Sequence, residues 1–264
     1  MTNLPIRLKR LRKTPTIRRM LRETRLNIAE FIAPLFISES LPDKREINAM
    51  PGQFQLTLND LPDEIAALSK LGIPAVLLFG IPSHKDAEGT ASLESSGIIQ
   101  QAIRKIRSIN QEILIIADVC LCEYTDHGHC GVLHDQTINN DTTLERLAQQ
   151  AVSYADAGAD WVAPSSMTDG MVQAIRKALD NAQHQDVAIL SYAVKYSSCF
   201  YGPFREAALG APQFGDRKTY QMDPANAAEA IREATLDIAE SADLLMVKPA
   251  LSYLDIIYRV KQQF

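Results

Sequence analysis

The chain has 264 residues, of which 46% are apolar and 22% charged, and it carries a formal net charge of −5. This composition predicts a globular protein with a sizeable core and excludes a membrane protein, because no apolar run approaches the roughly 18 residues of a membrane-spanning helix. The N-terminus also lacks the apolar stretch of a secretory signal. We therefore expect a cytoplasmic protein whose four cysteines stay reduced.

The N-terminal segment is basic, with nine lysines and arginines among residues 1–25 and a single acid, Glu23. Three interpretations are open: a solvated tail or a strap over a neighbouring subunit, a nucleic-acid-binding arm, and an organelle transit peptide. The arm has no aromatic residue to stack on bases and the rest of the chain is acidic, so we expect no nucleic-acid partner. We predict an arm over residues 1–30 and a catalytic domain over residues 31–264.

Apolar runs of strand length alternate with amphipathic helical patterns along the rest of the chain. The strand-like runs cover residues 31–37, 74–80, 113–119, 160–164, 187–193 and 243–248. The helical patterns include residues 58–72, which Asn59 or Asp60 begins and Gly72 ends, and residues 142–158, 171–182 and 226–242. This alternation indicates a parallel sheet covered by helices. Because no glycine-rich phosphate-binding loop is present, we favour an α/β fold of the (β/α)8 TIM-barrel type over a dinucleotide-binding open sheet.

A closed barrel of this type has eight strands, and the chain supplies six before the final helical pattern at residues 251–264. We therefore expect the last two βα units, of about 30 residues each, to be missing. Segments 81–97, 120–140 and 196–224 are interpreted as long loops that make up the length. In such a barrel the first and sixth strands would have unpaired edges, and the chain would aggregate or be inactive by itself.

Two lysines stand at the C-terminal ends of predicted strands, Lys195 after the fifth apolar run and Lys248 after the sixth. Active sites of parallel barrels lie at these strand ends. Burial lowers the pKa of an amine and leaves it neutral enough to attack a carbonyl carbon. One such lysine predicts Schiff-base chemistry, and two predict two carbonyl substrates held side by side. The alternative is a pair of structural lysines, each buried beside an acid.

Three cysteines follow the third predicted strand in the segment DVCLCEYTDHGHCG. Cys120 and Cys122 are two residues apart and project on the same side of an extended strand, and Cys130 returns after a short loop. Three thiolates suit Zn²⁺ and leave a fourth position open, which is the pattern of a catalytic zinc. Two alternatives remain open: the cysteines are small core residues, or His127 or His129 supplies a fourth ligand and closes a structural site.

Further polar side chains flank these groups. Asp118 ends the third strand and is a candidate for orienting an amine or moving protons, with the capping of backbone amides as the alternative. Cys199 stands alone and is expected to be inert or exposed. The lid segment, which we define as residues 197–221, carries Arg205 and Arg217, which would bind a carboxylate through paired hydrogen bonds unless they are ordinary surface arginines. A segment of this length is more often a lid than a passive connector.

Seven motifs follow one another along the chain: RLRKTP, AMPG, DVCLCEYTDHGHCG, SYAVKY, FYGPFREA, GDRKTYQM and MVKPA. In this order they resemble the porphobilinogen synthase family, also called 5-aminolevulinate dehydratases, and the likeness covers the whole chain. The cysteines are similar to those of its zinc-dependent branch, whereas other branches carry aspartate-rich, magnesium-type residues there. The resemblance implies a lyase that condenses two 5-aminolevulinate molecules into porphobilinogen in tetrapyrrole and haem synthesis. It also implies a homo-octamer in which the arm embraces a neighbour.

The resemblance gives each candidate residue a role. Lys248 would form the Schiff base with the first substrate and Lys195 would hold the second, beside Asp118. Zinc on Cys120, Cys122 and Cys130 would assist the loss of water. Residues that would contact the substrates are Arg205, Arg217, Gln221, Tyr201, Phe204 and, at the end of the fourth strand, Ser165.

Glu233 matches a glutamate that some bacterial members of this family use at an allosteric Mg²⁺ site between subunits. The alternative is an ordinary exposed acid on a helix, one turn after Glu229. Two rival functions complete the set. One is an aldolase-type Schiff-base barrel, which needs one lysine and no thiolate-bound metal, and the other is a non-catalytic zinc-binding barrel whose lysines are structural.

Overall fold

The computed structural model describes residues 4–264, so the first three residues of the predicted arm lie outside the described part. Eight strands form one sheet in the order β10-β9-β8-β5-β4-β1-β3-β2. Their bounds are β1 Ile32–Ser38, β2 Arg45–Glu46, β3 Phe54–Leu56, β4 Ala75–Ile81, β5 Leu114–Val119, β8 Trp161–Pro164, β9 Ala188–Lys195 and β10 Leu244–Lys248. A separate antiparallel hairpin consists of β6, Leu133–His134, and β7, Thr137–Ile138.

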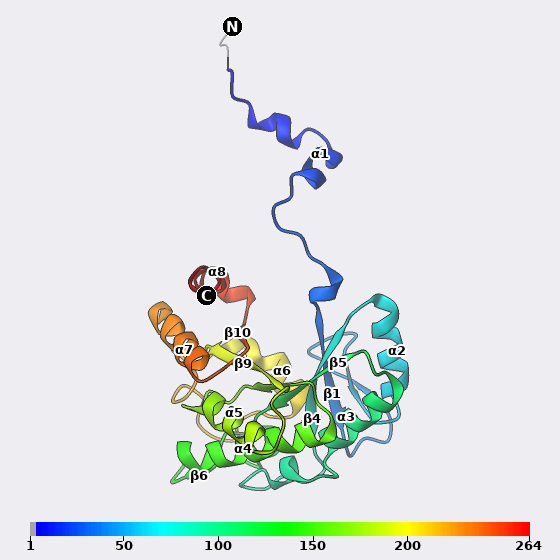
Figure 1. Ribbon diagram of the computed structural model, residues 1–264, viewed down its shortest axis with the longest axis vertical. Helices are drawn as coiled ribbons and strands as arrows, with labels where there is room; N and C mark the ends of the chain where they lie inside the picture. The colour runs from blue at the N-terminus through cyan, green and yellow to red at the C-terminus, as the bar shows by residue number, and fades with distance from the viewer. Residues whose placement is uncertain (1–3) are drawn as a thin grey trace.

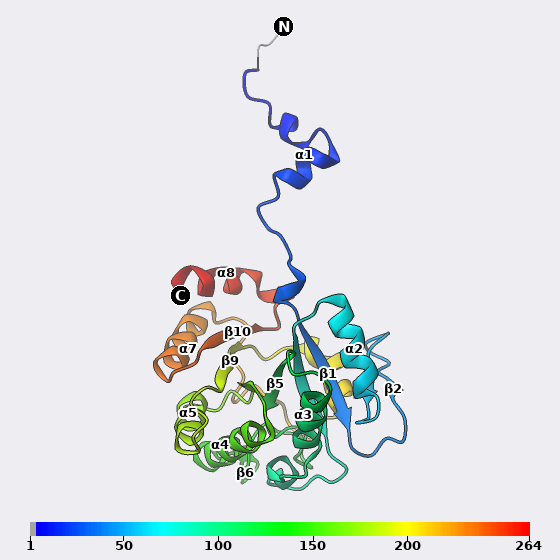
Figure 2. The ribbon, with the colours of Figure 1, turned by 45° about the vertical axis from the view of Figure 1, so that its right-hand side comes forward.

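Helices follow most of these strands, as Figures 1 and 2 show. The α-helices are α1 Pro15–Met20, α2 Leu61–Leu71, α3 Ile98–Ile109, α4 Asn140–Ala157, α5 Met171–Asn181, α6 Gly202–Ala208, α7 Ala227–Ala239 and α8 Leu254–Gln263. Short 3-10 turns cover Leu8–Arg12, Ile28–Glu30, Thr90–Leu93, Cys199–Tyr201 and Leu251–Tyr253.

The six predicted strands are confirmed as β1, β4, β5, β8, β9 and β10, each parallel to its neighbour in the sheet. The pairing of β1 with β4 runs in continuous register from Ile32 with Ala75 to Ser38 with Ile81. The helix predicted at residues 58–72 is α2. Asp60 is its N-cap, and Gly72 ends it in the left-handed conformation with φ of 80°.

The expectation of an unpaired first strand is wrong, because β3 pairs in parallel with β1 at Phe36 and Ile37 and covers part of that edge. Within residues 4–264 the sixth strand, β10, pairs with β9 alone. The three predicted loops also contain regular structure: a 3-10 turn in 81–97, the β6–β7 hairpin in 120–140, and α6 in 196–224. Helix α3, which the predicted set lacked, buries isoleucines at helical spacing, among them Ile99, Ile103 and Ile106.

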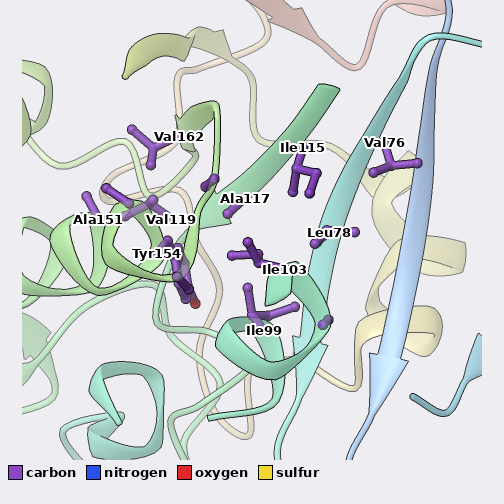
Figure 3. Packing of buried hydrophobic residues seen from close by; sticks show 14 of the residues in the cluster. Val76, Leu78, Ile99, Ile103, Ile115, Ala117, Val119, Ala151, Tyr154 and Val162 are labelled. Carbon is purple, nitrogen blue, oxygen red and sulfur yellow. The ribbon is translucent and has the colours of Figure 1, made fainter. Parts of the chain in front are cut away.

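Alternation along the strands creates two apolar layers. The outer core lies between the strands and helices α2 to α5 (Figure 3). Its labelled members in Figure 3 are Val76, Leu78, Ile99, Ile103, Ile115, Ala117, Val119, Ala151, Tyr154 and Val162. The inner core lies on the opposite face of the sheet and includes Phe36, Phe79, Ile116, Leu190 and Tyr192. Side chains at the C-terminal strand ends of this inner face are therefore the ones that can reach a common site.

The N-terminal arm is exposed over its described length, residues 4–30, except at the half-buried Thr14 and Ile17. It leads away from the body of the molecule (Figures 1 and 2). Thr14 is the N-cap of its helix α1, and the hydroxyl of Thr14 accepts a hydrogen bond from the amide of Ile17 at 3.2 Å. Among the helices of residues 4–264, none combines the length and the apolar character that crossing a membrane requires.

Candidate active site

The two predicted lysines lie side by side on adjacent strands, Lys195 at the end of β9 and Lys248 paired with it at the end of β10. Just before this pair, β9 contains one residue more than β10, which is a β-bulge. Simple alternation from Tyr192, which belongs to the inner core, would send Lys195 to the outer face. Because the bulge shifts the phase by one residue, both lysines reach the inner face.

One aromatic ring lies near the amine of Lys195, and three lie near the amine of Lys248. The Nζ atom lies 5.4 Å from the ring centre of Tyr192 for Lys195 and 5.0 Å for Lys248. Nζ of Lys248 also lies 4.4 Å from the ring centre of Phe204 and 6.0 Å from that of Tyr201. Burial, followed by the charge of Lys195, lowers the pKa of Lys248 to about 8. A substantial neutral fraction of this amine near neutral pH makes it suited to nucleophilic attack on a carbonyl.

Ser165 connects Lys195 to the predicted acid Asp118. Its hydroxyl donates to Oδ2 of Asp118 at 3.1 Å, and its carbonyl oxygen accepts a hydrogen bond from Nζ of Lys195. Asp118 is 6% exposed, and its pKa is raised by burial and next by the charge of Glu123. No backbone amide of residues 4–264 donates to this carboxyl group, which leaves the capping alternative without support.

The three predicted metal-ligand cysteines form one buried cluster. Cys120, Cys122 and Cys130 are 2% exposed or less, their sulfur atoms all lie within 4.8 Å of one another, and Sγ of Cys120 is 3.4 Å from Sγ of Cys122. Tetrahedral zinc with Zn–S bonds of about 2.3 Å separates its sulfurs by roughly 3.8 Å. Hydrogen bonds from the other two thiols hold the pKa of Cys130 well below its usual value, so a thiolate is favoured. This donor set fits a thiophilic metal ion.

Both neighbouring histidines are fully engaged with protein groups. Nδ1 of His127 accepts from the amide of His129 at 3.1 Å, and its Nε2 lies 3.2 Å from the carbonyl oxygen of Ala87. Nε2 of His129 lies 3.0 Å from the carbonyl oxygen of Phe214, and its Nδ1 lies 3.1 Å from the hydroxyl of Tyr220. Neither ring has a free nitrogen for a metal in this arrangement, so the closed four-ligand alternative loses support. Cys199 is exposed and apart from the cluster.

The lid segment is docked on the protein and brings its predicted polar side chains inside. Arg217 and Gln221 are 4% and 3% exposed, and the amide of Gln221 donates to the carbonyl oxygen of Arg217 at 2.8 Å. Arg205 lies in α6 and is half-buried. Both guanidinium groups are near enough to Tyr201 to act on it electrostatically. The hydroxyl of Tyr201 itself donates to the carbonyl oxygen of Tyr196 at 2.8 Å.

Phe204 completes the aromatic wall on the lid side. Its ring centre lies 5.0 Å from that of Phe79 and 5.8 Å from that of Phe36, both in edge-on contact. These three rings belong to the inner core or pack against it. The hydrophobic wall fixes the start of α6 beside Lys248, and it explains why a short helix forms in a segment that reads as a loop.

Buried polar atoms without partners concentrate at this site. In residues 4–264 six buried side-chain nitrogen and oxygen atoms make no hydrogen bond, and five of them belong to residues predicted to bind or process a substrate. A buried polar atom left unpaired costs about 1–3 kcal/mol, and charged side chains are rarely left so. A ligand that carries both an anionic group and a hydrogen-bond donor such as an amine would satisfy them, because three of the atoms are donors and two are acceptors. The five atoms are Oδ1 of Asp118, Nε of Arg205, Nε of Arg217, and Nε2 and Oε1 of Gln221.

Glu233 lies elsewhere, on α7. It borders a cavity of about 480 Å³ that Asp169, Asp223 and Glu229 also line, together with the end of the lid segment. Burial, followed by the charges of Asp169, Asp237 and Glu229, raises the pKa of Glu233 to about 7. The predicted cation residue therefore stands among other acids, outside the cysteine and lysine cluster.

Three residues at the site carried no prediction. The ring of Tyr192 lies close to the amines of both lysines. Its place in the sequence, three residues before Lys195 in an apolar run, could have indicated it as a site residue. Glu123 is 2% exposed next to the cysteines, and a charged residue inside an apolar metal-binding motif was visible in the sequence. Lys85 donates from Nζ to the carbonyl oxygen of Leu209 at 2.7 Å and so holds the lid segment from across the site. No sequence signal indicates that long-range contact.

The family model described as delta-aminolevulinic acid dehydratase matches residues 5–264. The chain belongs to the delta-aminolevulinic acid dehydratase family. A relative of that name from Halalkalibacterium halodurans is 55% identical over 255 residues, which covers 97% of this chain and 78% of the relative. One from Methanothermobacter thermautotrophicus is 52% identical over 260 residues, 98% of this chain and 79% of the relative. The predicted delta-aminolevulinic acid dehydratase family and its hydro-lyase activity are thereby confirmed.

A solved structure of the family has the same fold. The crystal structure of delta-aminolevulinic acid dehydratase (porphobilinogen synthase) from Toxoplasma gondii ME49, in complex with the reaction product porphobilinogen, matches with a TM-score of 0.95 at 40% identity. The match covers 99% of this chain and 75% of that chain. The predicted TIM-barrel architecture is confirmed by this likeness and by the six parallel strands.

Proposed function

We propose that this chain condenses two molecules of 5-aminolevulinate into porphobilinogen with loss of two water molecules. The observation that carries the proposal is the convergence of two paired lysines with five unpartnered buried polar atoms. Each substrate brings a ketone, a carboxylate and an amine. The ketones suit the two lysines, and the carboxylate and amine suit the atoms that lack partners.

The two lysines play parallel roles in the proposed reaction. Lys248, with its pKa lowered to about 8, attacks the ketone carbon of the first substrate, and the ketone oxygen leaves as water when the imine forms. Lys195 holds the second substrate in the same way. New carbon–carbon and carbon–nitrogen bonds between the substrates then replace the bonds to the lysines, which are released as amines. The two ketone oxygens account for the two water molecules of the overall reaction.

Asp118 and the lid segment are the groups that orient the substrates in the proposed reaction. Asp118 lies within electrostatic reach of both lysines and is the group proposed to orient a substrate amine and exchange a proton with it. Arg205, Arg217 and Gln221 bind the carboxylate of the second substrate through their unpartnered donors. Ser165 holds Asp118 and Lys195 in place through its two hydrogen bonds, and the rings of Tyr201 and Phe204 keep water from Lys248.

We further propose Zn²⁺ as the ion that Cys120, Cys122 and Cys130 hold, because three thiolates suit a soft ion. When bound, this ion supplies a Lewis acid that assists the loss of water from the second substrate. The thiols must stay reduced for this, which agrees with a cytoplasmic location. A homo-octamer in which the arm embraces a neighbour, and an allosteric Mg²⁺ at Glu233, complete the proposal.

Borohydride trapping tests the assignment of the lysines. The protein is mixed with 5-aminolevulinate, reduced with borohydride and mapped by mass spectrometry. We expect adducts on Lys248 and Lys195 in the native sequence, and one adduct on Lys248 in Lys195→Ala. An adduct on one lysine alone in the native protein would favour the aldolase-type alternative, and no adduct would favour a non-catalytic barrel.

A further inference from the structure

His129 stands where the metal-binding segment meets the lid segment. We define the metal loop as residues 120–130, so His129 precedes the last cysteine of the cluster. His129 is 4% exposed, and its ring contacts the lid segment twice, at the carbonyl oxygen of Phe214 and at the hydroxyl of Tyr220. The ring of Phe214 also lies 4.8 Å from that of His129, centre to centre. One side chain of the metal loop thus ties together two lid positions six residues apart.

The two hydrogen bonds define the state of this ring. A carbonyl oxygen only accepts, so Nε2 of His129 carries the hydrogen that is donated to Phe214. Nδ1 then accepts from the hydroxyl of Tyr220. Tyr220 packs in turn against the three cysteines. A continuous path of contacts therefore runs from the thiol cluster through Tyr220 and His129 to the tip of the lid segment.

The backbones of the two segments are also in close contact around His129. The amide of Gln213 donates to the carbonyl oxygen of His127 at 3.0 Å, and Nη2 of Arg217 donates to that of Gly128 at 2.9 Å. A Cβ on Gly128, whose φ is 70°, would lie 2.1 Å from the carbonyl oxygen of Ala211. Only glycine fits at this position, because the backbones of the two segments are packed directly against each other. Opening of the lid segment would therefore break its contacts with the metal loop.

We propose that His129 is a positioning residue that couples closure of the lid segment to metal binding at the cysteines. The inference rests on the proposed function in one respect, the metal on the cysteine cluster. A metal ion that holds the three sulfurs together fixes the metal loop in the conformation to which the lid segment docks. Conversely, a docked lid holds the loop ready for the metal. Linkage requires both effects to have the same factor.

The coupling is measured from both sides on the purified protein. Cobalt(II) replaces zinc as a probe, because its thiolate absorption band reports occupancy of the cysteines. Its dissociation constant is determined with and without saturating levulinate, a keto acid that has the ketone and carboxylate of the proposed substrate but lacks its amine, so that it can occupy the site without completing the reaction. Hydrogen exchange of residues 209–221 is followed by mass spectrometry with and without the metal. We expect each ligand to change the other measurement by about 10-fold, within the range of about 5–150 usual for coupled sites.

Variants locate the coupling. His129→Phe keeps a ring against Phe214 and removes both hydrogen bonds, and it should reduce the two factors to nearly 1. Tyr220→Phe removes one hydroxyl and should give an intermediate factor, which serves if the first variant folds poorly. The control His134→Phe changes an exposed histidine of the β6–β7 hairpin and should leave the factors unchanged. A general loss of stability would instead speed hydrogen exchange of residues 209–221 equally with and without metal. The ratio of the two exchange rates would then stay the same.

Three results would overturn the proposal. A factor of 1 in the native sequence would show that no coupling exists. The cobalt band and porphobilinogen formation would persist in that case, so the metal site and the proposed function would stand. An unchanged factor in both variants would show that the coupling does not pass through His129. Absence of any thiolate–cobalt band would remove the metal site on the cysteines and the coupling with it, whereas borohydride adducts on Lys248 and Lys195 test the condensation separately.

Discussion

Buried side chains of the outer core are aliphatic with few exceptions, and the hydroxyl of its Tyr154 is paired, with its oxygen 3.0 Å from the hydroxyl oxygen of Tyr124. At the C-terminal strand ends of the inner face, five buried polar atoms make no hydrogen bond, one on Asp118 of β5 and four on the lid segment that covers these ends. Asp118 stands in the same strand as the outer-core residues Ala117 and Val119, one residue away in phase. The difference teaches that alternate residues of one strand serve stability on one face and chemistry on the other. Changing one face should therefore leave the property of the other intact.

The largest expected effect is on the inner face. Lys248→Ala should lower the rate of porphobilinogen formation by about 10³-fold or more, because it removes the attacking amine. The free energy of unfolding should stay the same or rise, since folding no longer desolvates that amine. Lys248→Arg should not rescue the rate, because a guanidinium stays protonated. Steady-state rates and denaturant unfolding on the same preparations check this, and a variant that loses stability together with activity would contradict the separation of faces.

The cysteine cluster gives the next effect. Cys122→Ala should abolish tight metal binding and lower the rate by about 10²-fold or more, given several kcal/mol of charge stabilisation from a Lewis acid. The fold should persist, because the site has three protein ligands and contributes mainly to chemistry. Bound metal is measured by elemental analysis and secondary structure by circular dichroism. Cys199→Ala, at the exposed cysteine, is the matched control, and full activity of the Cys122 variant after chelation would disprove a catalytic metal.

The reciprocal change belongs to the outer core. Ile103 is fully buried in α3, and Ile103→Ala should lower the free energy of unfolding by about 2–5 kcal/mol through lost burial and the cavity left behind. The rate per folded molecule should not change. Ile109→Ala, in the same helix at a residue that is 39% exposed, should cost under about 0.5 kcal/mol. A rate that falls with Ile103→Ala in fully folded protein would show that the two faces are coupled.

The smallest effect concerns pH. The positive charge of Lys195 is the second cause of the lowered pKa of Lys248, after burial. Removing it in Lys195→Gln should raise that pKa, so the pH at which imine formation on Lys248 is half-maximal should move upward by roughly one unit, or about 1.4 kcal/mol. It should stay below the value of a free lysine, because burial remains. Borohydride trapping across pH measures the midpoint, and a downward shift would reverse the assigned sign.

Sequence patterns predict the six parallel strands well, because strands that are covered on both faces are apolar at nearly every position. They also place Lys195, Lys248 and the three cysteines, whose chemistry is local to short motifs. The edge contact of β3 was missed because a strand of three residues is too short for a periodic signal. Helix α6 was missed because its residues gain stability from Phe36 and Phe79, which lie far away in the chain.

The contacts that assemble the site are long-range in the same sense. Nothing local indicates that Lys85 reaches Leu209 or that His129 reaches Phe214, because each bond joins segments that only the fold brings together. The sequence around His127 and His129 does not show which of their ring nitrogens are hydrogen-bonded to other protein groups. From the sequence a metal site with three or four protein ligands is therefore possible, and the hydrogen bonds of the folded chain favour three.

The extra residue of β9 has an evolutionary consequence. Tyr192 faces the inner core, and the amine of Lys195 at the end of the same strand also points inward only because β9 contains one more residue than β10 between paired positions. Deletion of one residue from β9 would turn the amine of Lys195 toward the helices and leave the active site with a single lysine. On this geometry, a site with two lysines and a site with one would differ by a single residue of strand length, with the same catalytic side chains in the sequence.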